Sequence, residues 1–151
     1  MSLNKNGLDG TSWAILEALQ ENGRIPYSEL GKKVGLSTPA VSERVRKLEE
    51  NGIITGYRAT LDMQKLGREI TAFVSIRSTP DKNKKLIDFI KNSPVVEEGH
   101  YITGQASYIV KIVVPKIKDM ETFIGEISHF GATNTSIVMS THVDKKIFRD
   151  L

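Results

Sequence analysis

Residues 28–57 read SELGKKVGLSTPAVSERVRKLEENGIITGY, and this stretch decides the fold of the first half of the chain. Leu30 marks the inner face of a short helix, and Gly35 ends that helix as a left-handed C-terminal residue would. Ser37 is a good N-cap for the next helix, and Pro39 fits its first turn. The stretch therefore predicts two helices joined by a tight turn.

The second of these helices has an apolar side and a charged side. Val41, Val45 and Leu48 fall at i, i+4 and i+7, which places them on one stripe facing a core. Asn51-Gly52 is a typical helix end. A small hairpin is expected next, with Thr55-Gly56 near its turn and four apolar positions around it, namely Ile53, Ile54, Tyr57 and Ala59.

Another helix precedes this stretch. Its apolar stripe is predicted to run through Trp13, Leu16 and Gln20, with Ile15 and Leu19 alongside. Asp9 or Thr11 can cap the start of this helix, and Gly23 can end it. Three helices followed by a hairpin are the outline of a winged helix-turn-helix, a fold that places its last helix in the major groove of DNA.

The polar side of that last helix is the predicted DNA-contacting surface. Arg46 is expected to reach guanine edges, and Lys33 and Lys47 to meet phosphates. The free N–H groups of a helix N-terminus also favour a phosphate. The candidate DNA-contacting residues are Lys33, Ser37, Thr38, Pro39, Ala40, Ser42, Glu43, Arg44, Arg46, Lys47 and Arg58. The alternative is a three-helix protein-interaction module with an ordinary charged surface.

Composition and charge set wider bounds. The chain has 151 residues, a net charge of +3 and no cysteine, so disulfides and thiolate metal sites are excluded. Seven basic and four acidic side chains lie between Arg24 and Arg58, so this segment carries as much net charge as the whole chain. No apolar run approaches the roughly 20 residues that span a bilayer, and residues 1–9 lack the apolar region of a signal peptide. A cytoplasmic protein is expected.

The pattern changes after Gly67. Residues 71–78 alternate with period two, as a strand does, and a helix is expected to end before Pro94. Strands are predicted over residues 95–102, 108–114 and 133–143, with a second helix ending near Gly131. The order β-α-β-β-α-β is that of the ferredoxin-like fold. We therefore predict an α+β protein with a winged helix-turn-helix domain (1–60), a linker (61–69) and a second domain (70–151).

One face of the predicted sheet lacks helical cover. Phe73, Tyr101 and Val113 are expected on this face. An open apolar sheet face favours association with another subunit. A homo-oligomer is therefore predicted.

The chain resembles the Lrp/AsnC family of leucine-responsive and asparagine-responsive transcription regulators. The resemblance covers nearly the whole chain and is carried by Gly23-Arg24-Ile25, Val34-Gly35-Leu36-Ser37, Glu43-Arg44-Val45, Arg46-Lys47-Leu48-Glu49, Gly52-Ile53-Ile54, Gly56-Tyr57, Thr103-Gly104, Tyr108, Val114-Pro115 and Val138-Met139. It implies a DNA-binding regulator whose second, RAM/ACT-like domain senses a small molecule, usually an amino acid, and builds dimers or larger assemblies such as octamers.

The same resemblance points to an effector site. Relatives often carry acidic residues in the turn between the middle strands, where this chain reads Gly104-Gln105-Ala106-Ser107-Tyr108. Both acidic positions are neutral here, so the turn offers hydrogen bonds without charge. The candidate effector-binding residues are Thr103, Gly104, Gln105, Ala106, Ser107, Thr133 and Thr135. The alternative is a plain hairpin turn used for contacts between subunits.

Two other functions stay open at this point. An architectural DNA-compacting protein would show little sequence preference and no effector response. Some proteins of this two-domain architecture are haem-pathway decarboxylases, and an enzyme of that kind would have to draw on His100, Tyr101 and Tyr108. The three histidines have no metal-ligand spacing, and the chain carries no nucleotide-binding or nucleophile motif. No catalytic residue, metal or cofactor is expected.

Overall fold

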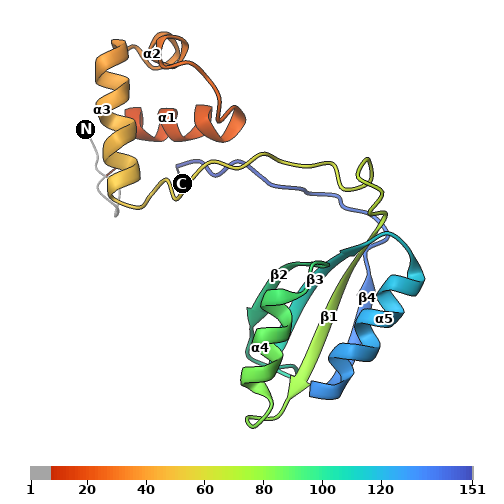
Figure 1. Cartoon of the computed structure of the whole chain (residues 1–151). Coiled ribbons are helices and arrows are strands. Elements are labelled where there is room, and N and C mark those ends of the chain that lie inside the picture. The colour runs from red at the N-terminus through yellow and green to blue at the C-terminus, as the bar shows by residue number, and fades with distance from the viewer. Residues whose placement is uncertain (1–7, 151) are drawn as a thin grey trace. The chain divides into compact units, whose positions relative to one another are not determined.

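The computed structural model describes residues 8–150, which form two compact units. The first unit runs to Thr60 and also takes in the segment from Val143 onward, and the second spans Leu61–His142. Figure 1 shows the helices of the first unit and the sheet of the second unit with its helices.

The first unit is built from α1 (Gly10–Glu21), α2 (Tyr27–Val34) and α3 (Thr38–Glu50). Asp9 caps α1 by accepting a 2.8 Å hydrogen bond from the Ser12 N–H, and Ser37 caps α3 as predicted. Gly35 ends α2 with a φ of 69°, in the left-handed region. A Cβ at Gly31 would lie 2.5 Å from the Leu36 carbonyl oxygen, so the turn between α2 and α3 requires glycine there.

The helices pack around one small core. Leu30, Val41 and Val45 are fully buried, and Leu48 is nearly so. The expected stripe of α3 is therefore confirmed. In α1 the buried side runs through Ser12, Ile15, Ala18 and Leu19, so the predicted core positions Ile15 and Leu19 are confirmed. The line through Trp13, Leu16 and Gln20 was wrong: Trp13 and Leu16 only flank the core and Gln20 is exposed, because both sets of positions have helical spacing and tertiary packing selects between them.

The predicted hairpin after α3 is not formed, and residues 51–60 contain no strand. The backbone N–H groups of Ile53 and Ile54 both donate to the Leu48 carbonyl, so they close the end of α3. The Tyr57 hydroxyl instead donates to Glu49 Oε1 at 3.0 Å. Partial burial and the Glu49 carboxylate raise the pKa of Tyr57 to about 12. The segment is thus attached to α3 through Glu49 without strand pairing.

The C-terminal segment packs on α1. The side-chain amide of Gln20 donates to the Phe148 carbonyl and accepts from the Phe148 N–H, both at 2.9 Å. Arg149 lies 3.7 Å from Glu17 in an ion pair. Residues 143–150, which we expected in the second domain, are therefore part of the first unit.

The second unit confirms the β-α-β-β-α-β order. Its elements are β1 (Ile70–Ser78), α4 (Asn83–Asn92), β2 (Val96–Tyr101), β3 (Tyr108–Val114), α5 (Ile117–Ile127), the 3-10 turn η1 (Ser128–Phe130) and β4 (Gly131–Ile137). The strands form one antiparallel sheet in the order β2-β3-β1-β4. The final strand was predicted over 133–143 but runs from Gly131 to Ile137, where its pairing with β1 ends at Ala72.

Helices α4 and α5 lie on the same face of this sheet, as Figure 1 shows. The core beneath them consists of alternate strand residues and helix side chains, among them Ala72, Val74, Ile76, Leu86, Val110, Ile112, Met120, Phe123 and Ile127. The alternation expected in β1 is therefore confirmed, with the even-numbered residues inward.

The other face of the sheet exposes fewer apolar side chains than predicted. Phe73 lies on it and is 39% exposed, but Val113 is only 2% exposed. Tyr101 pairs with the buried Tyr108, and the two rings contact each other with centroids 5.2 Å apart. Opposite residues share a face, so Tyr101 belongs to the helix-covered side. The cause is a bulge between Val96 and Glu98, which reverses the alternation in the rest of β2.

Candidate DNA-binding helix and effector cleft

The outer face of α3 is polar and exposed. Val41, Val45 and Leu48 hold the opposite side of the helix in the core, which turns Ser42, Glu43, Arg46 and Lys47 toward solvent. At its N-terminus Ser37, Thr38 and Pro39 are exposed and Ala40 is partly so. Lys33 and Arg58 are exposed as well, with the Lys33 ammonium 3.9 Å from Glu21. The first unit thus presents most of the predicted DNA-contacting residues at its surface.

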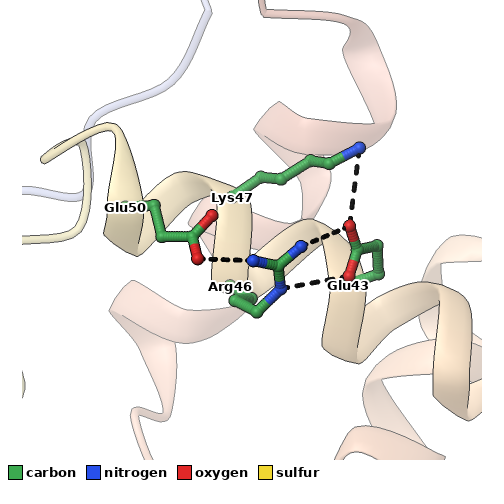
Figure 2. Close-up of polar contacts among 4 residues, drawn as sticks. All are labelled: Glu43, Arg46, Lys47 and Glu50. Carbon is green, nitrogen blue, oxygen red and sulfur yellow. Dashed lines mark hydrogen bonds and ion pairs between the residues drawn. The ribbon is translucent and has the colours of Figure 1, made fainter.

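The cations of this face are paired with acids of the same helix (Figure 2). Arg46 donates from Nε to Glu43 Oε2 at 3.1 Å and from a terminal nitrogen to Glu43 Oε1 at 2.7 Å. Its other terminal nitrogen bonds Glu50, and Lys47 lies 3.6 Å from Glu43. These hydrogen bonds lower the pKa of Glu43 and raise that of Arg46. Exposed pairs at this spacing are weak, so a ligand can replace them.

Arg44 is held differently from Arg46. Its guanidinium donates to both carboxylate oxygens of Asp9, at 2.9 and 2.8 Å, and to the Ser12 hydroxyl at 3.1 Å. Hydrogen bonds from Ser12 and then the pair with Arg44 lower the pKa of Asp9 to about 2. Arg44 therefore links α3 to the start of α1. Sequence reasoning missed this contact, since 35 residues separate the two partners.

The effector candidates are only partly brought together. A shallow cleft of about 260 Å³ in the second unit is lined by Ser75, Arg77, Gln105, Ala106, Ala132, Thr133 and Asn134. Thr103, Gly104, Ser107 and Thr135 do not line it. Thr133 and Thr135 pair with the buried Ile76 and Val74, which directs their side chains to the helix-covered face.

Arg77 is the one charged residue that lines this cleft, and the sequence analysis did not single it out. Its Nε donates to the Gln105 carbonyl at 2.7 Å, which holds the guanidinium against the turn. The turn is itself attached to β1, because the Ser107 N–H donates to the Ile76 carbonyl at 2.9 Å. The cleft therefore offers a cation and neutral hydrogen-bonding groups.

Two family models cover most of the chain. One, described as winged helix-turn-helix DNA-binding, matches residues 8–55, and the other, described as Lrp/AsnC ligand binding domain, matches residues 71–148. The chain belongs to the Lrp/AsnC family of transcriptional regulators.

Its curated relatives within the Lrp/AsnC family span nearly the same length. The uncharacterized HTH-type transcriptional regulator YezC of Bacillus subtilis is 42% identical over 134 residues, which are 89% of this chain and 95% of the relative. The proline dehydrogenase transcriptional activator of Rhodobacter capsulatus is 36% identical, over 91% of this chain and 94% of that protein. The family and the α+β fold predicted from sequence are thereby confirmed.

Solved structures of Lrp/AsnC proteins agree with this fold. Bacillus subtilis LrpC has a TM-score of 0.87 and 34% identity, covering 92% of this chain and 99% of that one. The regulator NMB0573 of Neisseria meningitidis, solved as a complex with L-Met, has a TM-score of 0.87 and 26% identity, covering 93% and 96%. This member of the Lrp/AsnC family is thus a DNA-binding transcriptional regulator with a ligand-binding domain.

Within residues 8–150, no group of three or more potential metal ligands is found. The described helices include none that is both long and apolar enough to cross a membrane. His100 lies 3.4 Å from Glu98 on β2, whereas His129 contacts the Glu126 carbonyl. These two histidines therefore have different neighbours on different elements.

Proposed function

We propose that this regulator reads DNA with the outer face of α3 in the major groove. The observation that carries the proposal is the division of α3 into a buried apolar stripe and an exposed polar face that begins at an exposed N-terminus. Ser42 and Arg46 would face base edges, with Arg46 on a guanine. Lys33, Lys47, Arg58 and the residues Ser37–Ala40 would meet phosphates.

Arg44 enters this proposal in another role. Its guanidinium is engaged by Asp9 and Ser12, so it would fix the angle between α1 and α3. A contact of Arg44 with DNA, which the sequence suggested, would require it to leave that partially buried pair.

The second unit would hold two or more DNA-binding units together in a homodimer or larger assembly. Phe73 on the uncovered sheet face is its most evident apolar contact. Linked DNA-binding units gain avidity because the second contact with DNA is intramolecular. The protein would act through binding alone and catalyse no reaction.

A small-molecule effector would bind at the cleft beside Arg77. The guanidinium is the only formal charge in the lining, so the complementary group on the ligand is an anion such as an amino-acid carboxylate. The L-Met complex of the Neisseria relative supports an amino acid as the class to test first. Such an effector would act by favouring one assembly or DNA-bound form over another.

The DNA proposal is tested by selecting duplexes from a random pool with the full chain. The selected duplex should then bind on the order of a thousandfold more tightly than a scrambled duplex of equal length and composition. Affinity should also fall steeply with salt. Equal affinity for both duplexes would support an architectural role instead, and absence of binding at low salt would refute the proposal.

A further inference from the structure

The outer face of α3 carries no excess positive charge, although it is the face proposed to meet DNA. At 100° per residue, the side chains opposite the buried stripe are Glu43, Arg46, Lys47 and Glu50. Two bases and two acids share this face, and all four interact (Figure 2). The face as a whole therefore adds no net positive charge that would attract the DNA backbone.

Glu43 occupies the centre of this arrangement. It accepts two hydrogen bonds from Arg46 and is 3.6 Å from the Lys47 ammonium, so one carboxylate holds both cations of the face. It also lies nearer than Glu50 to the N-terminal end of α3, the end that enters the groove in this fold.

This position gives Glu43 opposite effects on two kinds of DNA contact. On unmatched DNA, Arg46 and Lys47 can only exchange Glu43 for phosphates, which leaves the carboxylate unpaired beside like charges. On a matched site, Arg46 can bind a guanine edge in the bidentate way while Glu43 accepts from a cytosine amino group. Only the matched site therefore gives both Arg46 and Glu43 a new hydrogen-bond partner in place of each other.

We infer that Glu43 is a specificity-determining residue, which keeps Arg46 and Lys47 from non-specific phosphate contacts and frees them at a sequence that also offers Glu43 a hydrogen-bond donor. This inference rests on the proposed reading of DNA by α3. It explains why a helix that reads DNA keeps its cations paired with acids.

The test compares the full-length wild type with Glu43→Gln, which removes the charge and keeps the size of the side chain. Affinities are measured by fluorescence anisotropy for the selected duplex and for the scrambled duplex, over a series of salt concentrations. Glu43→Gln should bind the scrambled duplex on the order of tenfold more tightly, with a salt slope steeper by about one. The ratio of specific to non-specific affinity should fall about tenfold or more.

The control is Glu121→Gln, which makes the same charge change at an exposed position of α5 in the second unit. The inference is overturned if the affinity ratio of Glu43→Gln equals that of the wild type, or if Glu121→Gln lowers it equally. Circular dichroism melts establish that each variant is folded. If wild-type protein does not distinguish the two duplexes, the proposed function fails, whereas an unchanged ratio in the variant refutes only the role of Glu43.

Discussion

Helix α3 and the sheet of the second unit hold their arginines in different ways. Arg44 and Arg46 on α3 are paired with carboxylates, whereas Arg77 on β1 is held by the carbonyl of Gln105. A carboxylate neutralises the guanidinium that it positions, but a carbonyl positions it and leaves its charge. The comparison indicates that a ligand must compete for Arg46, while an anion can approach Arg77 directly.

The largest effect should follow from removing the cations of α3. Arg46→Ala combined with Lys47→Ala should weaken binding to a selected duplex on the order of a hundredfold, since a bidentate arginine–guanine contact alone is worth roughly 1–3 kcal/mol. Fluorescence anisotropy at fixed salt measures this loss. Both side chains are exposed, so the melting temperature should change little. Unchanged affinity would refute the groove assignment of α3.

Asp9→Asn tests whether Arg44 has a structural role, in contrast to Arg46, which is proposed to read DNA. Asparagine keeps the N-cap of α1 but removes the charge that holds Arg44. Because the pKa of Asp9 is lowered to about 2 from 3.8, its contribution to stability is complete above pH 3.8 and is lost as pH falls toward 2. The variant should be roughly 1–2 kcal/mol less stable at pH 7 and should approach the wild type as pH falls through about 2.

Urea unfolding across this pH range gives the measurement, with Asp144→Asn as a control at an exposed position of the same unit. A stability difference that stays constant with pH would contradict the assignment of the effect to the Asp9 charge. Tighter DNA binding without loss of stability would instead place Arg44 on the DNA, because the substitution frees its guanidinium from the charged pair.

Arg77→Gln should weaken the ligand response of the second unit. We expect one or more of the twenty amino acids to raise the melting temperature of the wild type, and the variant to bind about tenfold more weakly through loss of a charge-assisted contact. Lys84→Gln on α4 is the matched control, because it removes an exposed positive charge that does not line the cleft. A shift retained by Arg77→Gln would place the effector elsewhere.

Local signals predicted α3 correctly, whereas contacts between distant segments escaped sequence reasoning. The Val41, Val45 and Leu48 stripe and the Ser37 cap depend on neighbours within one helix, and both are confirmed. The Arg44–Asp9 pair depends on how α1 and α3 pack, and no spacing rule encodes it.

The candidate effector site shows the same limit. The turn at Gln105 was located from sequence, but its contact with Arg77 joins residues 28 positions apart. Tyr101 was placed on the wrong face because one bulged residue in β2 reverses the alternation that follows. Register and bulges result from pairing between strands, so period-two alternation within a single strand cannot reveal them.

The smallest effect is expected from Glu50→Gln. This variant tests whether the selectivity of α3 for DNA depends on the position of Glu43 or only on the total charge of the face. Glu50 pairs with Arg46, but it is the last residue of the helix and Glu43 still holds the guanidinium with two hydrogen bonds. Exposed pairs contribute little, so the melting temperature should stay within about 2 °C of the wild type. Affinity for the scrambled duplex should stay within about threefold. If Glu50→Gln raised that affinity as much as Glu43→Gln, the total charge of the face would control selectivity, and the central place of Glu43 would have no special effect.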